Sequence, residues 1–353
     1  MRVLFVYKYL TLGGVETVLR ARLDGLAAWG IHSSAWFFHD LGGRSLFQHR
    51  DDAVRIGTAA ECARHSRNFD VLATIDTEEV LPPLRRVSPR PALVVECHSP
   101  YLENLEYLRS LSQDSPRAVL VPSHHQREIV RQRIDTPTPV RVVPNPLRAA
   151  FIRPLGEELP LLERPIVAWI GRLDELKNWR GFLEMGAALL DRCPEVELAI
   201  AGKPVDDRGA DELLAAAKAT KTLGRLRWLR GLPHDRVPAL LDLVRASGGV
   251  VVSTSRGDSF GMTVAEAMAR GCAVVAPGEG PFNEFVRHGD TGSLYDPTDI
   301  VDAARQVEIL LRDQELRVAC GLRARDAILA RHAPDIALGH LAGELRRLDS
   351  QPA

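Results

Sequence analysis

The stretch GGVVVSTSRGDSFGMTVAEAMARGCAVVA, residues 248–276, predicts a strand, a turn, a helix and a second strand in direct succession. Its first six residues are two glycines, three valines and a serine, a composition typical of a strand buried on both faces of a parallel sheet. Residues 260–269 carry apolar side chains at helical spacing, and Asp258 and Ser259 are both favourable N-cap types. Gly271 stands where a glycine ends a helix.

A helix that begins at the carboxyl end of a parallel strand directs unpaired backbone N–H groups towards the space above the sheet. An anion such as a phosphate is favoured there, and a glycine at position 261 lets it approach closely. Asp258 and Glu266 flank this position eight residues apart. Because carboxylates accept hydrogen bonds from hydroxyl groups, we expect each to hold a diol on one side of a phosphate-centred ligand.

The segment resembles the Glu-x7-Glu element of retaining GT-B glycosyltransferases of the family 4 type (glycosyl transferases group 1), with Asp258 in place of the first glutamate. The resemblance implies that Asp258 contacts the donor sugar and that Glu266 holds the ribose. The backbone between them would bind the diphosphate, through Ser259, Phe260, Gly261, Met262 and Thr263. Asp is one methylene shorter than Glu, so the sequence does not identify which sugar, or which hydroxyl, it contacts. The alternative is that Asp258 only caps the helix and that Glu266 is a solvated surface acid.

Further motifs support the resemblance. Arg172 and Lys177 follow the apolar strand expected at 166–170, at the spacing at which the family places two cations on the donor diphosphate. Such cations stabilise the charge that grows on the leaving group more than they stabilise the ground state. Solvated cations in a loop are the alternative. Leu232 corresponds to a residue whose backbone contacts the nucleotide base, and the loops 280–284 and 288–292 match the family's closing loops.

In the N-terminal half, Gly13 and Gly14 lie between a strand expected at 2–7 and a helix expected at 15–29. They resemble the family's glycine-rich loop near the donor phosphate and acceptor, although an ordinary tight turn is an equal alternative. His98 follows a strand expected at 93–97, where open α/β sheets bind ligands. The family often has a histidine there, close to the donor sugar. His98 could hydrogen-bond a sugar hydroxyl or assist the leaving group, or simply be a capping or surface residue.

The alternation of strands and helices predicts an α/β protein, and 353 residues exceed one typical core. With the resemblance, this implies a GT-B fold of two Rossmann-like domains facing a central cleft. We expect an acceptor-binding domain at 1–150, a proline-rich linker at 151–164 and a nucleotide-sugar-binding domain at 165–330. A C-terminal helix at 334–350 should cross back onto the first domain.

Composition narrows the function. A net charge of −1 gives no global attraction to nucleic acid. No apolar run is long enough to span a membrane and no secretory signal is evident, so we expect a cytoplasmic protein. The five cysteines are scattered without metal-ligand spacing and are expected to be small buried thiols. Only five of 45 basic residues are lysine, which suggests a GC-rich bacterial genome.

The sequence therefore predicts a retaining hexosyltransferase with a nucleotide-sugar donor, UDP-sugar being favoured, and an unidentified acceptor. No cofactor is expected. No metal is expected either, because no two aspartates stand two residues apart as in an Asp-x-Asp metal site. A nucleotide-sugar epimerase or isomerase of the same architecture, or a non-catalytic nucleotide-sugar-binding protein, remain the alternatives. A dehydrogenase is disfavoured by the absence of G-x-G-x-x-G.

Overall fold

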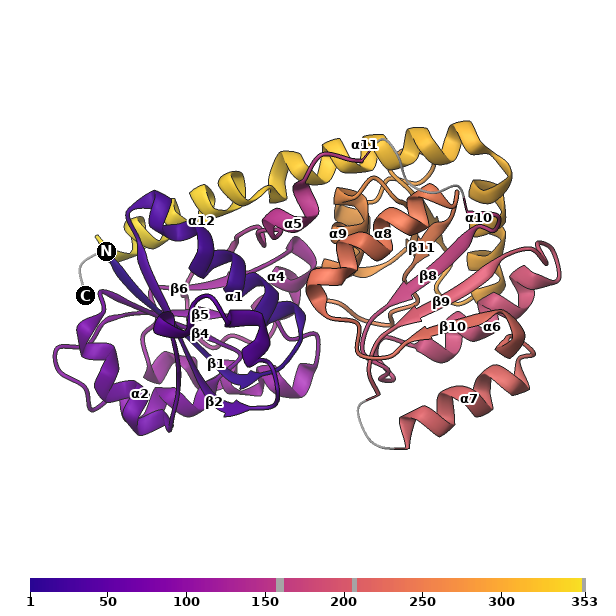
Figure 1. Cartoon of the computed structure of the whole chain (residues 1–353). Helices are drawn as coiled ribbons and strands as arrows, with labels where there is room; N and C mark the ends of the chain where they lie inside the picture. Colours follow the sequence, from indigo (N-terminus) through magenta and orange to yellow (C-terminus); the bar gives the residue numbers. More distant parts are fainter. Residues whose placement is uncertain (157–161, 205–207, 351–353) are drawn as a thin grey trace. The chain divides into compact units, whose positions relative to one another are not determined.

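The computed structural model describes residues 1–156, 162–204 and 208–350 (Figure 1). The chain divides into two compact units, which we describe separately. The first comprises Met1–Ala149 together with the segment from Arg331 onward, and the second comprises Ala150–Ala330. The first unit is thus built from both ends of the chain, whereas the second is contiguous.

The first unit contains a seven-stranded parallel sheet in the order β3-β2-β1-β4-β5-β6-β7. The strands are β1 (Arg2–Leu10), β2 (His32–Asp40), β3 (Val54–Ile56), β4 (Val71–Ile75), β5 (Ala92–Glu96), β6 (Ala118–Val121) and β7 (Val140–Val142). The helices are α1 (Gly14–Gly25), α2 (Ala59–His65), α3 (Leu81–Leu84), α4 (His124–Arg131) and α12 (Pro334–Asp349), with a long 3-10 segment, η6 (Leu102–Gln113).

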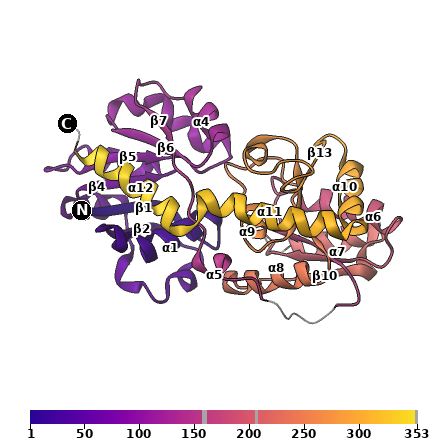
Figure 2. The same ribbon diagram turned by 90° about the horizontal axis from the view of Figure 1, so that it is seen from above.

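Alternate residues of β1 face the two sides of this sheet, as the pleat requires. Val3 and Phe5 pack into a core with α1 and α12, whereas Leu4 and Val6 pack into a second core with α2, α3 and η6. The C-terminal helix α12 therefore lies on α1, and Figure 2 shows the two side by side. Both faces of the sheet are covered, which explains its continuous apolar strands.

The second unit contains a six-stranded parallel sheet in the order β10-β9-β8-β11-β12-β13. Its strands are β8 (Ile166–Ile170), β9 (Glu197–Ala201), β10 (Leu226–Leu229), β11 (Val250–Val252), β12 (Ala273–Pro277) and β13 (Ser293–Tyr295). Its helices are α6 (Trp179–Leu190), α7 (Gly209–Ala219), α8 (Val237–Ala246), α9 (Met262–Ala269), α10 (Ile300–Arg312) and most of α11 (Gln314–His332); the short α5 (Ala149–Ile152) begins at the unit boundary.

Each sheet reverses its strand order once, between β1 and β4 in the first unit and between β8 and β11 in the second. Such a reversal leaves a crevice at the carboxyl ends of the two strands, because the connections leave them towards opposite faces. The predicted pair of Rossmann-like α/β domains is confirmed, and each has one switch point of the kind at which such sheets bind ligands.

The structure differs from the sequence prediction in several boundaries. Strand β1 is longer than the expected 2–7, because it continues to pair with β2, up to Leu10 and Asp40, after its pairing with β4 has ended. The short strands β3, β7 and β13 were not predicted. Of the expected linker at 151–164, residues 157–161 lie outside the described residues.

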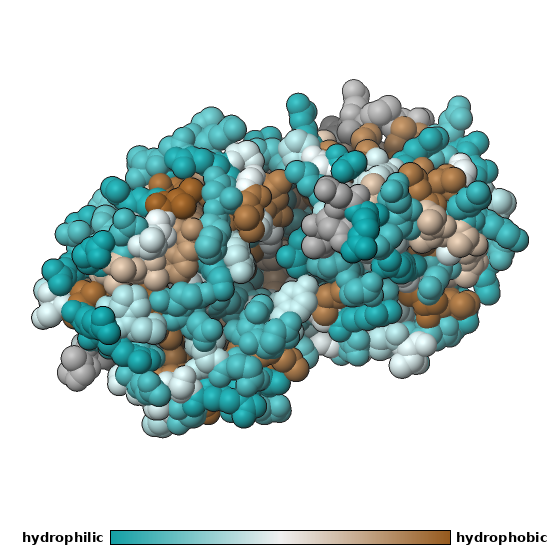
Figure 3. Space-filling view, turned by 90° about the horizontal axis from the view of Figure 1, so that it is seen from below, coloured by the Kyte–Doolittle hydropathy of each residue, from teal (hydrophilic) through white to brown (hydrophobic). Residues whose placement is uncertain are grey.

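On the face drawn in Figure 3, hydrophilic side chains surround separate apolar patches. Among the described residues, no helix has the length and apolar character that crossing a bilayer requires. All five cysteines are buried and unpaired, as predicted.

The start of β11 depends on close contact between two backbones. A Cβ added at Gly249 would lie 1.9 Å from the carbonyl oxygen of Ile166 at the start of β8, a contact that only a backbone shift could relieve. We therefore expect Gly249→Ala to lower the free energy of unfolding by about 3 kcal/mol. Gly224→Ala is the control, since a methyl group added there would meet no atom within 4 Å. Equal urea midpoints for the two variants would contradict this account.

Candidate functional site

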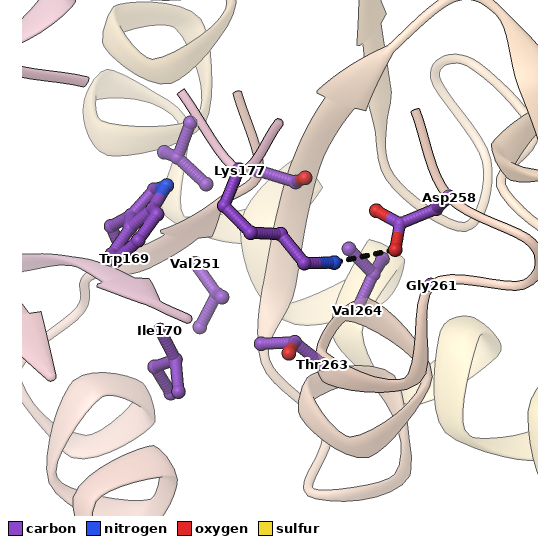
Figure 4. Close-up of a pocket in the computed structure, with 10 residues that line it drawn as sticks. Trp169, Ile170, Lys177, Val251, Asp258, Gly261, Thr263 and Val264 are labelled. Carbon is purple, nitrogen blue, oxygen red and sulfur yellow. Dashed lines mark hydrogen bonds and ion pairs between the residues drawn. The ribbon is translucent and has the colours of Figure 1, made fainter. Parts of the chain in front are cut away.

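A pocket lies at the switch point of the second unit, where β8 and β11 separate. Trp169 and Ile170 of β8 form one wall, and residues 251–253 at the end of β11 form the other. The remaining lining comes from the loop before α6 and from the start of α9, through Lys177, Asp258, Gly261, Thr263 and Val264. Figure 4 shows these side chains around the opening.

Helix α9 begins two residues later than predicted. Its N-cap is Gly261, with φ 90° and ψ 52°, and no side chain caps it. The expectation that Asp258 or Ser259 caps the helix is therefore wrong, and Asp258 is available for other contacts. Gly261 is required for its left-handed backbone and because a Cβ there would lie 2.6 Å from the ring of Phe282. Besides the predicted approach of an anion, this glycine therefore permits the Phe282 side chain to pack closely against the start of α9.

The carboxylate of Asp258 is paired with Lys177. The Lys177 Nζ lies 2.5 Å from Asp258 Oδ1, across the pocket (Figure 4), and their side chains are 24% and 11% exposed. The backbone around Lys177 is also fixed, because its N–H donates to Asp174 Oδ1 at 2.8 Å and the hydroxyl of Thr254 donates to the Asn178 carbonyl at 2.8 Å. A cation and an anion therefore face the same small volume from two loops.

Arg172 lies differently from Lys177. Its side chain is 54% exposed, pairs with Asp174 at 3.1 Å, and is not among the residues that line the pocket. Of the two predicted cations, only Lys177 contributes to the pocket wall. A ligand that reached Arg172 would compete with Asp174 for its guanidinium.

Glu266 lies on α9 and is buried, so the alternative of a solvated surface acid is wrong. Its Oε1 lies 3.2 Å from Nε2 of His234, whose ring also packs against Phe151. His234 follows the turn at Gly231 and Leu232 after β10, and Gly231 adopts φ 69°. His234, which the sequence did not indicate as a site residue, thus joins the predicted base-contacting loop at Leu232 to the predicted ribose carboxylate of Glu266.

The remaining backbone candidates surround the start of α9. Gly261 and Thr263 line the pocket, whereas Ser259, Phe260 and Met262 do not. Phe260 is buried against Phe285, with ring centroids 5.2 Å apart. Its side chain therefore anchors the turn, and only its backbone remains as a candidate ligand contact.

The N-terminal candidates belong to the first unit. Gly13 is the N-cap of α1, and Gly14 is its first residue. A Cβ at Gly13 would lie 2.7 Å from Oε2 of the buried Glu16, so an alanine there would displace this carboxylate. His98 follows β5, is buried, and contacts Glu96 and Asp76. The alternative of a surface histidine is therefore wrong for His98.

Comparisons of the sequence with known proteins match about half of the chain. Residues 156–327 match the family described as "Glycosyl transferases group 1". The "D-inositol 3-phosphate glycosyltransferase" of Corynebacterium jeikeium is 34% identical over 158 residues, which are 44% of this chain and 37% of that protein. The "Alpha-D-kanosaminyltransferase" of Streptomyces kanamyceticus is 28% identical over 194 residues, 55% of this chain and 48% of that protein. The chain thus spans less than half the length of these curated relatives.

Solved structures match the whole chain. Anabaena Alr3699/HepE, solved in complex with UDP and glucose, superposes with a TM-score of 0.82 and 19% identity, covering 98% of this chain and 100% of that one. Sucrose-phosphate synthase from Thermosynechococcus elongatus gives a TM-score of 0.77 and 17% identity, with 98% of both chains covered. At such identities the likeness shows the fold, which is GT-B as predicted.

Asp76, beside His98, makes stability depend on pH. Burial raises the pKa of Asp76 to about 8, and the negative charge of Glu96 acts in the same direction, against the N–H of His98. A carboxyl whose pKa is raised on folding stabilises the protein fully below its unfolded pKa of about 4. That contribution falls by up to about 1.4 kcal/mol per pH unit and is lost as pH rises through 8.

We therefore expect Asp76→Asn to flatten the decline in unfolding free energy between pH 5 and pH 8. Asparagine tolerates the φ of 42° at this position and keeps an oxygen for the His98 N–H. Urea unfolding at several pH values measures the slope, and Asp52→Asn at an exposed position is the control. The same slope in wild type and Asp76→Asn would show that Asp76 is ionised throughout.

Proposed function

We propose that this protein is a group 1 glycosyltransferase that moves a hexose from a nucleoside-diphosphate sugar, with a UDP-sugar favoured, to an acceptor. The observation that carries the proposal is the switch-point pocket. Lys177, Asp258 and the start of α9 line it, and Glu266 follows on the same helix. The family match covers this segment, and a solved structure of the same fold is described in complex with UDP-glucose.

In this proposal the diphosphate lies at the start of α9, where Lys177 and the backbone N–H groups from Gly261 to Thr263 offset its charge. When the bond from the anomeric carbon to the diphosphate breaks, charge accumulates on the leaving oxygen. A fixed cation and fixed dipoles stabilise that charge more than they stabilise the bound donor. Arg172 would join them by exchanging Asp174 for a phosphate oxygen.

The two carboxylates contact different parts of the donor, Asp258 the sugar and Glu266 the ribose. Asp258 already bonds Lys177 through Oδ1 and has a second oxygen for a hydroxyl of the donor sugar. Glu266 bonds His234 through Oε1 and likewise has a second oxygen for the ribose diol. The backbone at Leu232 would meet the base. Retention of configuration and the family 4 assignment are proposed from the resemblance at residues 258–266.

The first experiment is a thermal-shift panel of UDP, GDP, ADP and dTDP. A ligand at 100 times its dissociation constant adds about 2.7 kcal/mol, which raises Tm by roughly 5 to 10 °C. We expect UDP to give the largest shift and UDP-glucose to be consumed only slowly without an acceptor. Release of an epimerised nucleotide sugar would support an isomerase, and binding without any turnover would support a binding protein.

Exchange of each carboxylate should separate their roles. Glu266→Gln is expected to weaken UDP binding by about tenfold, the effect of one lost hydrogen bond to a charged group. Asp258→Asn should lower turnover more than UDP affinity, because UDP carries no donor sugar. Isothermal titration with UDP and rates with UDP-glucose measure both. Equal losses of UDP affinity in the two variants would refute this division.

We further propose that the reaction needs no divalent metal, because Lys177 and the α9 N-terminus supply the positive charge. Activity should persist in excess EDTA, and Lys177→Ala should cost about 2 to 5 kcal/mol of transition-state stabilisation. The comparison variant is Lys218→Ala, in the last turn of α7. Loss of activity in EDTA with recovery on adding Mg²⁺ or Mn²⁺ would show that the proposed diphosphate site is incomplete.

A further inference from the structure

Glu266 in the second unit is an almost buried carboxylate of which one oxygen is held. Its side chain is 6% exposed. Oε1 lies 3.2 Å from Nε2 of His234, and among the described residues this is the only side-chain contact of Glu266. Oε2 is not one of the buried oxygen atoms that lack a partner, so it reaches solvent. Buried carboxylates are normally satisfied at both oxygens, and Oε2 is therefore placed to bind a polar group from outside the protein.

The position of Glu266 on α9 relates this carboxylate to the switch-point pocket. Thr263 lines that pocket, whereas Glu266 does not. Glu266 follows Thr263 by three residues, and residues three apart lie on the same face of a helix, about 4.5 Å apart along its axis. A ligand whose phosphate groups occupy the start of α9 would therefore bring the part that follows them towards Glu266.

His234 is held by elements other than α9. The preceding residue, Pro233, has its φ of −58° fixed by its own ring. The N–H of Arg236 donates to the Pro233 carbonyl at 2.8 Å, which closes the short 3-10 turn η8 (His234–Arg236) ahead of α8. The imidazole packs against Phe151 of α5, with ring centroids 5.4 Å apart, and Phe151 is fully buried. The place of this imidazole is thus set by α5 and α8, so the ring can orient a side chain on α9.

The hydrogen bond between the two side chains restricts the Glu266 carboxylate. A glutamate side chain rotates about several bonds, and ordering them when a ligand binds costs entropy. Contact with His234 orders them before any ligand arrives. The contact requires a hydrogen on Nε2, which a neutral ring protonated at that nitrogen and a doubly protonated ring both supply. The orientation of Glu266 is therefore the same in either charge state of the histidine.

We propose that His234 is a positioning residue that orients Glu266 and so determines how strongly the protein prefers a ribonucleotide to a 2′-deoxyribonucleotide. The ligand assignment rests on the proposed function. A carboxylate held through Oε1 presents Oε2 to the ribose diol in one direction, whereas a rotating carboxylate meets the diol in only part of its orientations. Removing the 2′-hydroxyl from the ligand takes away a contact that depends on this orientation and leaves the base and the diphosphate unchanged.

The first test compares UDP with 2′-deoxyuridine diphosphate by isothermal titration. We expect wild type to prefer UDP by about tenfold, the effect of one hydrogen bond to a charged group. His234→Met lacks the N–H and should lose most of this preference through weaker UDP binding, while its affinity for the deoxynucleotide changes less than about twofold. His234→Gln can donate from its own Nε2 and should keep the preference within about twofold of wild type. Equal losses for both nucleotides in His234→Met would show a merely structural role and overturn the proposal.

A double variant shows whether the histidine acts through the carboxylate. His234→Met/Glu266→Gln should bind UDP no more weakly than Glu266→Gln alone, because the carboxylate that His234 orients is already gone. Losses of UDP affinity that multiply in the double variant would mean that the two residues act separately, which contradicts a positioning role. The control is His65→Met in the first unit, which removes a histidine ring from contacts with Trp36 and Phe69 and should leave both affinities unchanged.

Two further outcomes are distinguished by the same titrations. If circular dichroism shows that His234→Met does not fold, His234→Ala replaces it, and added imidazole should restore the preference for UDP; no restoration would count against the proposal. Wild type that binds UDP and the deoxynucleotide equally well refutes the role of His234 alone. Wild type that binds neither nucleotide refutes the proposed function, and the role of His234 fails with it.

Discussion

The ion pair between Lys177 and Asp258 joins two loops that leave the second sheet on opposite sides of its switch point. One loop follows β8 and the other follows β11, and the strand reversal would otherwise separate them. Buried hydrogen bonds support the pair, from Trp169 Nε1 to the Thr254 hydroxyl and from that hydroxyl to the backbone before α6. These contacts fix the two loops and the charges that they carry relative to one another, and fixed charges are what charge stabilisation in catalysis requires.

Much of this arrangement follows from local sequence patterns. Apolar β-branched runs predicted the central strands, and Gly271, with φ 69°, ends α9 as predicted. The sequence also indicated that Lys177 and Asp258 belong to one site, and they line one pocket. The N-cap prediction was wrong because two good capping residues precede Gly261. The helix begins instead after Gly261, whose left-handed conformation leaves no room for a Cβ beside the Phe282 ring, and such a contact is not visible in a local pattern.

Contacts between distant residues were the other source of error. His234 and Glu266 are 32 positions apart, and Arg22 and Glu96 are 74 positions apart. Two signals were nevertheless present. Arg22 lies on α1 next to the core residue Leu23, and Glu96 ends an otherwise apolar buried strand. A cation and an anion that each occupy a position expected to be buried indicate a partner for one another, although a single sequence does not show which residues pair.

The position of α12 has a consequence for how the protein folds during synthesis. Leu338, Leu341, Leu345 and Leu348 complete the core beneath α1, yet they are the last described segment to leave the ribosome. The second unit, residues 150–330, lies between α1 and α12 in the sequence. Its synthesis takes roughly 10 to 35 s at bacterial or eukaryotic elongation rates. During that time the part of α1 and its core that α12 covers stays open, whereas the second unit can fold as soon as it emerges. Chaperones in the cell should therefore bind mainly nascent chains in which the first unit has left the ribosome and α12 has not.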